Sequence, residues 1–377
     1  MSHDPSMIPI HTMKHLFSFL ILILSFFTTI SLPIRNFRTT IIPSPSSWPT
    51  RIGPKQLQTS SKLATAIQLH QSTCTLPIGI NPSFAYSAGL GADLHIWSQS
   101  MCGAYENHIR LQTISGIKSL LPWNWLDQAK CKLNQDLSCY FNIRHKLCID
   151  TSNTKKKVVI KGFVSAFCPT VIHDLKSRTR WRTATTEYLF GINGLTDVVR
   201  IEVKRQIVKV FGSIGNVPKD MITVHIRWND KRSEMELVSI DKYVNAVRQI
   251  VQARNLGKNK KNQNKDKINI YISTEDPSAT DSFRTAAALE TNWNIYGDLT
   301  PIEHPKGVWY RVAEATSTKG RTGLEAIASL VIAMESNDFV LTTASNWSRL
   351  MDELRRSIVN RLCNNCTTMI DLREGQW

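Results

Sequence analysis

Apolar positions recur along this chain with two different periods, and their order predicts the secondary structure. In the first half, apolar residues three or four positions apart predict one face of a helix: Leu94, Trp97, Met101 and Tyr105. A strand-like run from Ile109 to Ile114 follows that helix. Because the chain becomes denser in apolar residues from about Leu63, globular structure is predicted to start there.

The second half alternates predicted strands with predicted helices. The strands are Met221 to Ile226, Ile268 to Ile272 and Phe339 to Thr342. Helices are predicted after the capping residue Ser239, from Leu324 to Met334, and around Leu350, Leu354 and Ile358. Alternation of this kind predicts an α/β fold with a mostly parallel sheet covered by helices.

The N-terminal region predicts a membrane anchor. No charged residue occurs from Leu16 to Ile34, and a helix of this length spans roughly 28 Å, close to the hydrocarbon thickness of a bilayer. We therefore expect a cytosolic tail at 1–13 and a transmembrane signal anchor at 14–34. A cleaved signal peptide is the alternative. Residues 35–62 are rich in proline, serine and threonine and predict an extended stem.

Composition and charge narrow the classes of function. The chain has 377 residues, of which 42% are hydrophobic, and a formal net charge of +16, which suits anionic ligands or membrane surfaces. Basic residues concentrate at Lys155–Lys157 and Lys258–Lys267, and the second run predicts an inserted surface loop. Since no RNP-like, zinc-finger or basic heptad pattern accompanies these runs, nucleic acid is not an expected partner.

Cysteine usage predicts an oxidising compartment. The even set of eight is Cys74, Cys102, Cys131, Cys139, Cys148, Cys168, Cys363 and Cys366. It outweighs the positive charges that follow the anchor, which by themselves favour a cytosolic C-terminus. We therefore expect a single-pass type II protein of the Golgi membrane with its catalytic part in the lumen. Disulfides are predicted within the stretch from Leu121 to Asp150, and a zinc site is the alternative reading of the cysteines.

Polar clusters follow three predicted strands. They are His225–Lys231, Ser273–Ser278 and Thr343–Arg349. In an open parallel sheet ligands bind beyond the carboxyl ends of the strands, so the three clusters predict one pocket, although each could simply cap a helix. A glycine-rich turn, Ala88–Asp93, precedes the first predicted helix and could hold a phosphate on its free N–H groups.

In their residues and in their order along the chain, these four motifs resemble those of the α1,6-fucosyltransferase family and its wider GDP-fucose-dependent superfamily. In that family one strand ends in His-x-Arg-Arg-x-Asp-Lys, a later one in a Thr-Asp-Asp-Pro-Ser turn, and a third in a Thr-x-Ser-Ser loop. The match covers roughly Gln68 to Leu354. It implies a GT-B-like glycosyltransferase of two Rossmann-like domains, here an N-terminal α/β domain at 63–197 and a GDP-sugar-binding domain at 198–377.

The resemblance also implies roles for particular residues. Arg227 falls on the arginine that contacts the donor diphosphate, and a guanidinium there neutralises phosphate oxygens as GDP leaves. Lys231 and Glu234 fall on the lysine and glutamate around the acceptor hydroxyl, with Glu234 as the expected base and Glu236 as its rival. The remaining donor-binding positions implied by the match are Gly89, Gly91, His95, His225, Asp230, Glu275, Asp276, Glu325, Thr343, Ser345 and Asn346.

The implied reaction is an inverting transfer of fucose from GDP-fucose to a glycan acceptor, in the α1,6 linkage of an N-glycan. The family works without a metal, and no Asp-x-Asp occurs in this chain to hold one, so neither metal nor cofactor is expected. In the family's GDP-binding site an acid contacts guanine, and Glu325 falls at that position.

This chain departs from the family pattern at Trp228, which stands where the second arginine is expected. Two alternatives therefore stay open, a protein O-fucosyltransferase and a lumenal carbohydrate-binding protein without turnover. Of two glycosylation sequons, Asn365-Cys-Thr is the expected glycan site, because Asn346-Trp-Ser lies in the predicted donor loop.

Overall fold

The structure is a computed structural model, which describes residues 60–80, 89–112, 123–132, 136–143, 158–159, 174–212, 216–228, 236–255, 267–297 and 311–374. All of these residues belong to one compact unit, Ser47–Trp377. The predicted tail and anchor, and the predicted stem up to residue 59, lie outside the described residues. Within the described ranges, no helix is long and apolar enough to cross a membrane.

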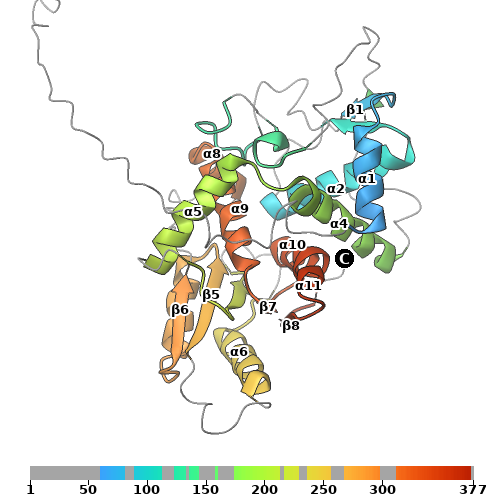
Figure 1. The fold of residues 1–377 in the computed structure, drawn as a ribbon. Helices are drawn as coiled ribbons and strands as arrows, with labels where there is room; N and C mark the ends of the chain where they lie inside the picture. The colour runs from blue at the N-terminus through green and yellow to red at the C-terminus, as the bar shows by residue number, and fades with distance from the viewer. Residues whose placement is uncertain are drawn as a thin grey trace, which may run out of the picture. The chain divides into compact units, whose positions relative to one another are not determined.

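A five-stranded parallel sheet organises the second half of the chain, in the order β6-β5-β4-β7-β8 (Figure 1). Its strands are β4 (Ile222–Ile226), β5 (Ile268–Thr274), β6 (Trp293–Gly297), β7 (Asp338–Leu341) and β8 (Thr368–Asp371). Every residue of β4 and β7 is buried, as expected of central parallel strands covered on both faces. The predicted parallel sheet is confirmed.

Helices cover both faces of this sheet. They are α5 (Asp197–Phe211), α6 (Ile240–Asn255), α7 (Pro277–Ala286), α8 (Arg311–Ser317), α9 (Arg321–Ala333), α10 (Asn346–Leu354) and α11 (Asn360–Leu362), with a π-helical stretch, Arg355–Val359, between the last two. Because side chains alternate along a strand, Ile222 and Val224 pack with α6 and α7, whereas Tyr271 and Phe339 pack with α5 and α9.

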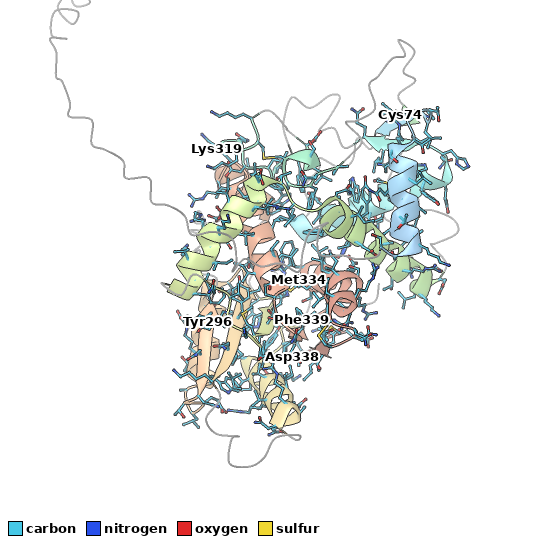
Figure 2. All side chains as sticks on the ribbon, viewed as in Figure 1. Cys74, Tyr296, Lys319, Met334, Asp338 and Phe339 are labelled. Carbon is cyan, nitrogen blue, oxygen red and sulfur yellow. A yellow bond between two sulfur atoms is a disulfide. The ribbon has the colours of Figure 1, made fainter. Side chains whose placement is uncertain are left out.

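A charged contact lies at the amino ends of the strands. Arg254, near the end of α6, donates from Nε to Asp338 Oδ2 at the start of β7 over 2.7 Å, and from Nη1 to the carbonyl of Asp220 over 2.9 Å. Asp338 and its neighbour Phe339 are labelled in Figure 2. This contact ties the end of α6 to the start of β7.

A smaller parallel sheet of three strands belongs to the first half, in the order β2-β1-β3. The strands are β1 (Ile78–Ile80), β2 (Arg110–Gln112) and β3 (Val158–Val159), accompanied by helices α1 (Lys62–Ser72), α2 (Leu90–Glu106) and α4 (Leu175–Thr186). The predicted helix with Leu94, Trp97 and Met101 on one face is α2, and all three side chains are buried. The short strands β1 and β3 were not predicted.

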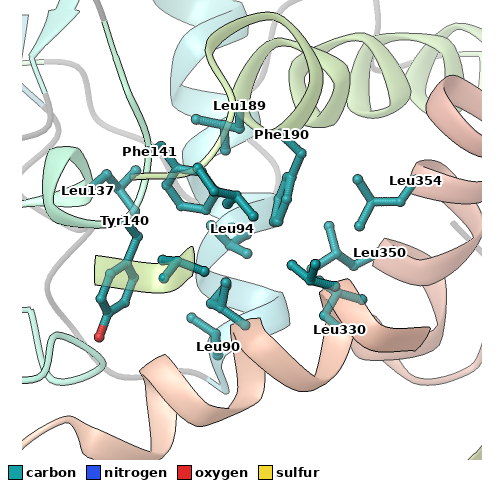
Figure 3. Close-up of a cluster of buried hydrophobic side chains, with 14 of the residues drawn as sticks. Leu90, Leu94, Leu137, Tyr140, Phe141, Leu189, Phe190, Leu330, Leu350 and Leu354 are labelled. Carbon is teal, nitrogen blue, oxygen red and sulfur yellow. The ribbon is translucent and has the colours of Figure 1, made fainter. Parts of the chain in front are cut away.

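One hydrophobic core joins the two halves of the chain. It contains Leu90 and Leu94 of α2, Leu330 of α9, and Leu350 and Leu354 of α10 (Figure 3). Helix α10 of the second half therefore packs on helix α2 of the first half. As a result, Ser47–Trp377 is one compact unit, although a sheet lies on either side of the predicted boundary at residue 197.

The described residues between Trp123 and Phe141 contact both α2 and α9. Trp123 Nε1 donates to Asp93 Oδ2 of α2 over 2.9 Å, and Tyr140 Oη donates to the carbonyl of Trp125 over 2.8 Å. On the other side, a Cβ at Gly323 of α9 would lie 2.1 Å from the Trp125 carbonyl oxygen. This position is therefore restricted to glycine by the neighbouring main chain.

The described cysteines are all in disulfides. Cys131 bonds to Cys139, Cys363 bonds to Cys366, and Cys74 and Cys102 are also disulfide-bonded. The first of these pairs confirms the disulfide predicted between residues 121 and 150. Since these thiols are oxidised, the zinc alternative is wrong for these six cysteines.

We predict that Gly323→Ala lowers the free energy of unfolding by about 2 kcal/mol, because overpacking against a main chain costs about 1–3 kcal/mol. Alanine gains only about 1 kcal/mol of helix propensity over glycine, so the clash outweighs this gain. Denaturant unfolding of the purified chain measures it. Gly89→Ala is the control, since a Cβ there meets nothing within 4 Å. Equal stability of the two variants would contradict the prediction.

Candidate functional site

Three neighbouring strands bring the predicted polar clusters to one edge of the large sheet. Strands β5, β4 and β7 are adjacent and parallel, so their carboxyl ends meet there. Thr274 Oγ1 donates to the carbonyl of Ile226 over 2.8 Å and links the ends of β5 and β4. The single pocket predicted for these clusters is thus consistent with the topology of the sheet.

Arg227 directly follows β4 and is 8% exposed. Its guanidinium forms an ion pair with Glu275, which follows β5, and donates from Nη1 to the carbonyl of Trp228 over 3.2 Å. Glu275 was predicted to contact the donor, and in this structure it balances the charge of Arg227. A diphosphate that binds Arg227 therefore competes with this carboxylate.

Trp228 packs into the protein. Its Nε1 donates to the carbonyl of Val238 over 2.9 Å, and its half-buried indole packs on the core between β4 and α6. The residue that replaces the family's second arginine therefore adds packing near this edge and no positive charge.

His225 is buried inside the sheet. Its Nδ1 lies 2.6 Å from Ser348 Oγ of α10, and Ser348 Oγ accepts the N–H of Thr342 over 3.1 Å. Burial, and secondarily the charge of Arg227, lower the pKa of His225 to about 3. This histidine is therefore uncharged at neutral pH and ties β4 to α10, and it offers no cation to a phosphate.

The loop from Thr343 to Asn346 is held from two sides. Asp371 of β8 accepts the N–H of Thr343 over 3.0 Å and also its hydroxyl. Arg349 donates to the carbonyl of Thr343 over 2.6 Å and to Asn346 Oδ1 over 3.2 Å. Ser345 is buried at the start of α10. The first N–H groups of α10 have no acceptor within the helix, as at any helix N-terminus.

The glycine-rich turn lies directly against this loop. Gly89 precedes α2, and a Cβ on Gly91 would lie 3.2 Å from the carbonyl carbon of Asn346 and 3.2 Å from the nitrogen of Trp347. The first turns of α2 and α10 are therefore in contact, which places two positive helix ends side by side. An anion at this point would be stabilised by both.

His95, one turn further along α2, contacts α10 from the same side. Its Nδ1 lies 3.2 Å from Asn346 Oδ1 and its Nε2 lies 3.1 Å from Glu353 Oε1. The predicted donor residues Gly91, His95 and Asn346 are thus brought together, although they are far apart in the sequence.

Two guanidiniums add positive charge next to α10. Burial lowers the pKa of Arg182, on α4, and that of Arg349, on α10, and their mutual repulsion adds to the effect at Arg349. The nearby carboxylate of Glu353 opposes both shifts. Arg349 belongs to the third predicted polar cluster, but no role was predicted for it. Arg182 and Asp371 were not predicted, because their partners Glu353 and Thr343 are distant along the chain.

Two predicted donor residues have other partners in this structure. Asp276 caps α7, where its Oδ1 accepts the N–H of Ser278 over 3.0 Å. Glu325 of α9 accepts from Arg205 over 3.0 Å and from Arg321 over 2.9 Å. Asp276 therefore caps a helix, which was the alternative to donor binding for its cluster. The contact of Glu325 with guanine stays a prediction.

The predicted catalytic residues Lys231 and Glu234, together with Asp230, lie outside the described residues. The rival base, Glu236, is described, and its side chain is exposed. Its carbonyl accepts from Arg373 Nη1, and the carbonyl of Arg373 in turn accepts the N–H of Ala344 over 3.0 Å. Arg227 precedes these residues in the chain and Glu236 follows them. Both lie at the carboxyl ends of the strands.

Among the described side chains, no group of His, Cys, Asp and Glu is arranged to hold a metal ion. The chemistry of the described site is that of an anion site, with guanidiniums, helix N-termini and hydroxyl groups. Such a site suits a phosphate or a diphosphate.

Comparisons with known proteins give likenesses of fold. No protein-family model matches the chain, and no curated protein matches it. The apo crystal structure of POFUT1 aligns with a TM-score of 0.37 at 10% identity, over 79% of this chain and 99% of that chain. The fucosyltransferase NodZ from Bradyrhizobium aligns with a TM-score of 0.36 at 10% identity, over 74% of this chain and 93% of that chain.

A crystal structure of NodZ α1,6-fucosyltransferase soaked with GDP-fucose aligns with a TM-score of 0.37 at 11% identity, over 74% of this chain and 92% of that chain. At such identities the activity of this chain has to be argued from its own residues. The two NodZ structures are described as fucosyltransferases.

Proposed function

We propose that this chain is an inverting glycosyltransferase that transfers fucose from GDP-fucose to a glycan acceptor, with the α1,6 linkage of an N-glycan as its specific form. The observation that carries the proposal is the contact between the first turns of α2 and α10 at Gly91 and Asn346. Two helix N-termini beside Arg349 form a site for a diphosphate. This contact joins two of the four motifs that carry the resemblance.

In the proposed reaction the acceptor hydroxyl oxygen bonds to the anomeric carbon of fucose while the bond from that carbon to the GDP oxygen breaks. Negative charge grows on the leaving diphosphate, where Arg227 and the helix N-termini stabilise it. Glu234 takes the proton of the hydroxyl, and Lys231 tunes its basicity. A single displacement of this kind inverts the configuration of the anomeric carbon, and it assigns no step to a metal.

A carbohydrate-binding protein without turnover is the second candidate function. The ion pair between Arg227 and Glu275 favours it, because the arginine assigned to the leaving group is balanced by a carboxylate. A protein O-fucosyltransferase is the alternative within the same donor chemistry, and it differs only in the acceptor. Transfer from GDP-fucose to an array of N-glycans and peptides separates all three.

We also propose that the catalytic part works in the Golgi lumen, anchored through residues 14–34. Disulfides at all the described cysteines support this, since disulfides persist in oxidising compartments. Asn365 is the proposed glycan site. Its exposed position supports this assignment, whereas Asn346 is engaged by His95 and Arg349.

We predict that the chain binds GDP about tenfold or more tightly than UDP, because a carboxylate paired with the guanine edge discriminates by about 1–3 kcal/mol. Calorimetry with both nucleotides measures the ratio. Glu325→Gln is expected to lower this preference. Should Glu325→Gln reduce thermal stability and leave the ratio intact, its role is confined to its pairs with Arg205 and Arg321.

We predict that Arg227→Ala lowers turnover of GDP-fucose by about two orders of magnitude, since a lost transition-state phosphate contact costs on the order of 3 kcal/mol. Arg227→Lys should not restore it, because lysine lacks the bidentate fork. Arg248→Ala is the matched control, since Arg248 forms a more exposed ion pair with Glu290. Full transfer activity of a folded Arg227→Ala variant would exclude the assigned role.

We predict that Glu234→Gln lowers transfer by roughly 10²- to 10⁴-fold with GDP affinity nearly unchanged, as expected for loss of a general base. Glu236→Gln is the comparison, and it should stay active. Thermal melting of both variants checks folding. An inactive Glu236→Gln beside an active Glu234→Gln would reverse the assignment of the base.

A further inference from the structure

His95 bridges two distant positions of a single helix. One ring nitrogen lies 3.2 Å from Asn346 Oδ1 at the start of α10, and the other lies 3.1 Å from Glu353 Oε1 near its end. Seven residues separate Asn346 from Glu353, which is close to two helical turns, so both side chains lie on the same face of α10. The imidazole of His95 therefore lies along this face and contacts both ends of it.

Glu353 is held in place by further contacts. It is 1% exposed, and its Oε2 accepts the hydroxyl of Thr186, at the end of α4, over 2.8 Å. The charges of Arg182 and Arg349 also act on it. A carboxylate buried to this degree is stable only when it is paired and hydrogen-bonded, so its partners hold α2, α4 and α10 in one arrangement.

The first residue of this face of α10, Asn346, lies at the candidate anion site. Asn346 is the first residue of α10, and its main chain lies against Gly91 of α2. A contact that fixes Asn346 therefore also sets the direction of the first N–H groups of α10. His95 is 5% exposed and both of its ring nitrogens face α10, so this side chain is directed at the helix.

We propose that His95 and Glu353 are positioning residues that together orient the first turn of α10 toward the donor diphosphate. His95 acts through Asn346 and makes no contact with the donor, and Glu353 acts from the far end of the helix. The inference deepens the proposed function and rests on it, since the ligand of the helix end is taken to be the diphosphate of GDP.

The test compares two neighbouring buried acids in the full chain. Glu353→Gln keeps the shape of the side chain and removes its charge, whereas Asp352→Asn does the same at an equally buried residue that pairs with Arg355 and Arg356. We expect Glu353→Gln to weaken GDP binding about tenfold, in the range of couplings between residues that share contacts. Asp352→Asn should leave GDP affinity unchanged even where it lowers thermal stability.

Hydrogen exchange of the amides of α10 gives a readout that does not depend on GDP. Exchange of the Arg349 amide, which donates to the Ser345 carbonyl over 3.0 Å, should be faster in Glu353→Gln than in wild type and unchanged in Asp352→Asn. Thr186→Val, which removes only the hydroxyl that Glu353 accepts, is the milder variant to use if Glu353→Gln does not fold. It should shift exchange and GDP affinity in the same direction by less.

A double-mutant cycle of His95→Gln and Glu353→Gln, read on GDP affinity, should show that the two losses do not add. Additive losses, or equal effects of Glu353→Gln and Asp352→Asn, would overturn the positioning role. So would unchanged exchange of the Arg349 amide in a folded Glu353→Gln variant. If wild type binds no GDP and exchange still responds as expected, the proposed function fails while the coupling of His95 to α10 stands.

Discussion

The approach of Gly91 to the main chain of Asn346 and Trp347 is the constraint on which the candidate site depends. A side chain at position 91 would require the beginning of α10 to shift by a few tenths of an ångström, because its Cβ would lie 3.2 Å from main-chain atoms. With glycine there, two helix N-termini come together, although parallel dipoles repel when their positive ends meet. Packing in the shared leucine core of α2, α9 and α10 opposes that repulsion, and so does a bound anion (Figure 3).

Paired charges surround this contact, and their acids are buried at Glu353 and half-buried at Asp371 and Glu275. Glu353 faces His95 and two arginines, Asp371 accepts from Thr343, and Glu275 pairs with Arg227. Removing a charge from water costs several kcal/mol unless a partner replaces the water, so each of these groups fixes the element that carries its partner. The edge of the sheet is consequently arranged before any ligand binds, which is the condition for electrostatic stabilisation of a leaving group.

The sequence predicted the elements that have a strong local pattern. Alternating strands and amphipathic helices located β4, β5, β7, α2, α6 and α9 to within a few residues. The strands β1 and β3 are only three and two residues long, and no periodicity is visible over such a length. The position of the site also followed from strand order, because a parallel sheet places all carboxyl ends at one edge.

The partners of individual site residues could not be predicted in the same way. Asp276 serves as a cap, and its proline and serine neighbours carry a local signal for this that competed with the donor role. Glu325 and Glu275 meet arginines from other elements, and such pairs depend on packing between segments far apart in sequence. The hydrogen bond of Trp228 could not be predicted either, since only the structure shows its indole donating to the carbonyl of Val238.

The exchange of an arginine for Trp228 changes how a diphosphate would be neutralised in this chain. A second guanidinium beside Arg227 would exceed the single charge of Glu275, whereas Trp228 leaves the pair balanced and adds apolar packing between β4 and α6. The remaining positive potential at this edge then comes from the N-termini of α2 and α10 and from Arg349. Helix ends cannot swing toward a ligand as arginine side chains do, so their effect depends on their position. For a bound diphosphate, glycine at position 91 and the contacts of His95 and Glu353 with α10 would therefore matter more here than they would beside two arginines.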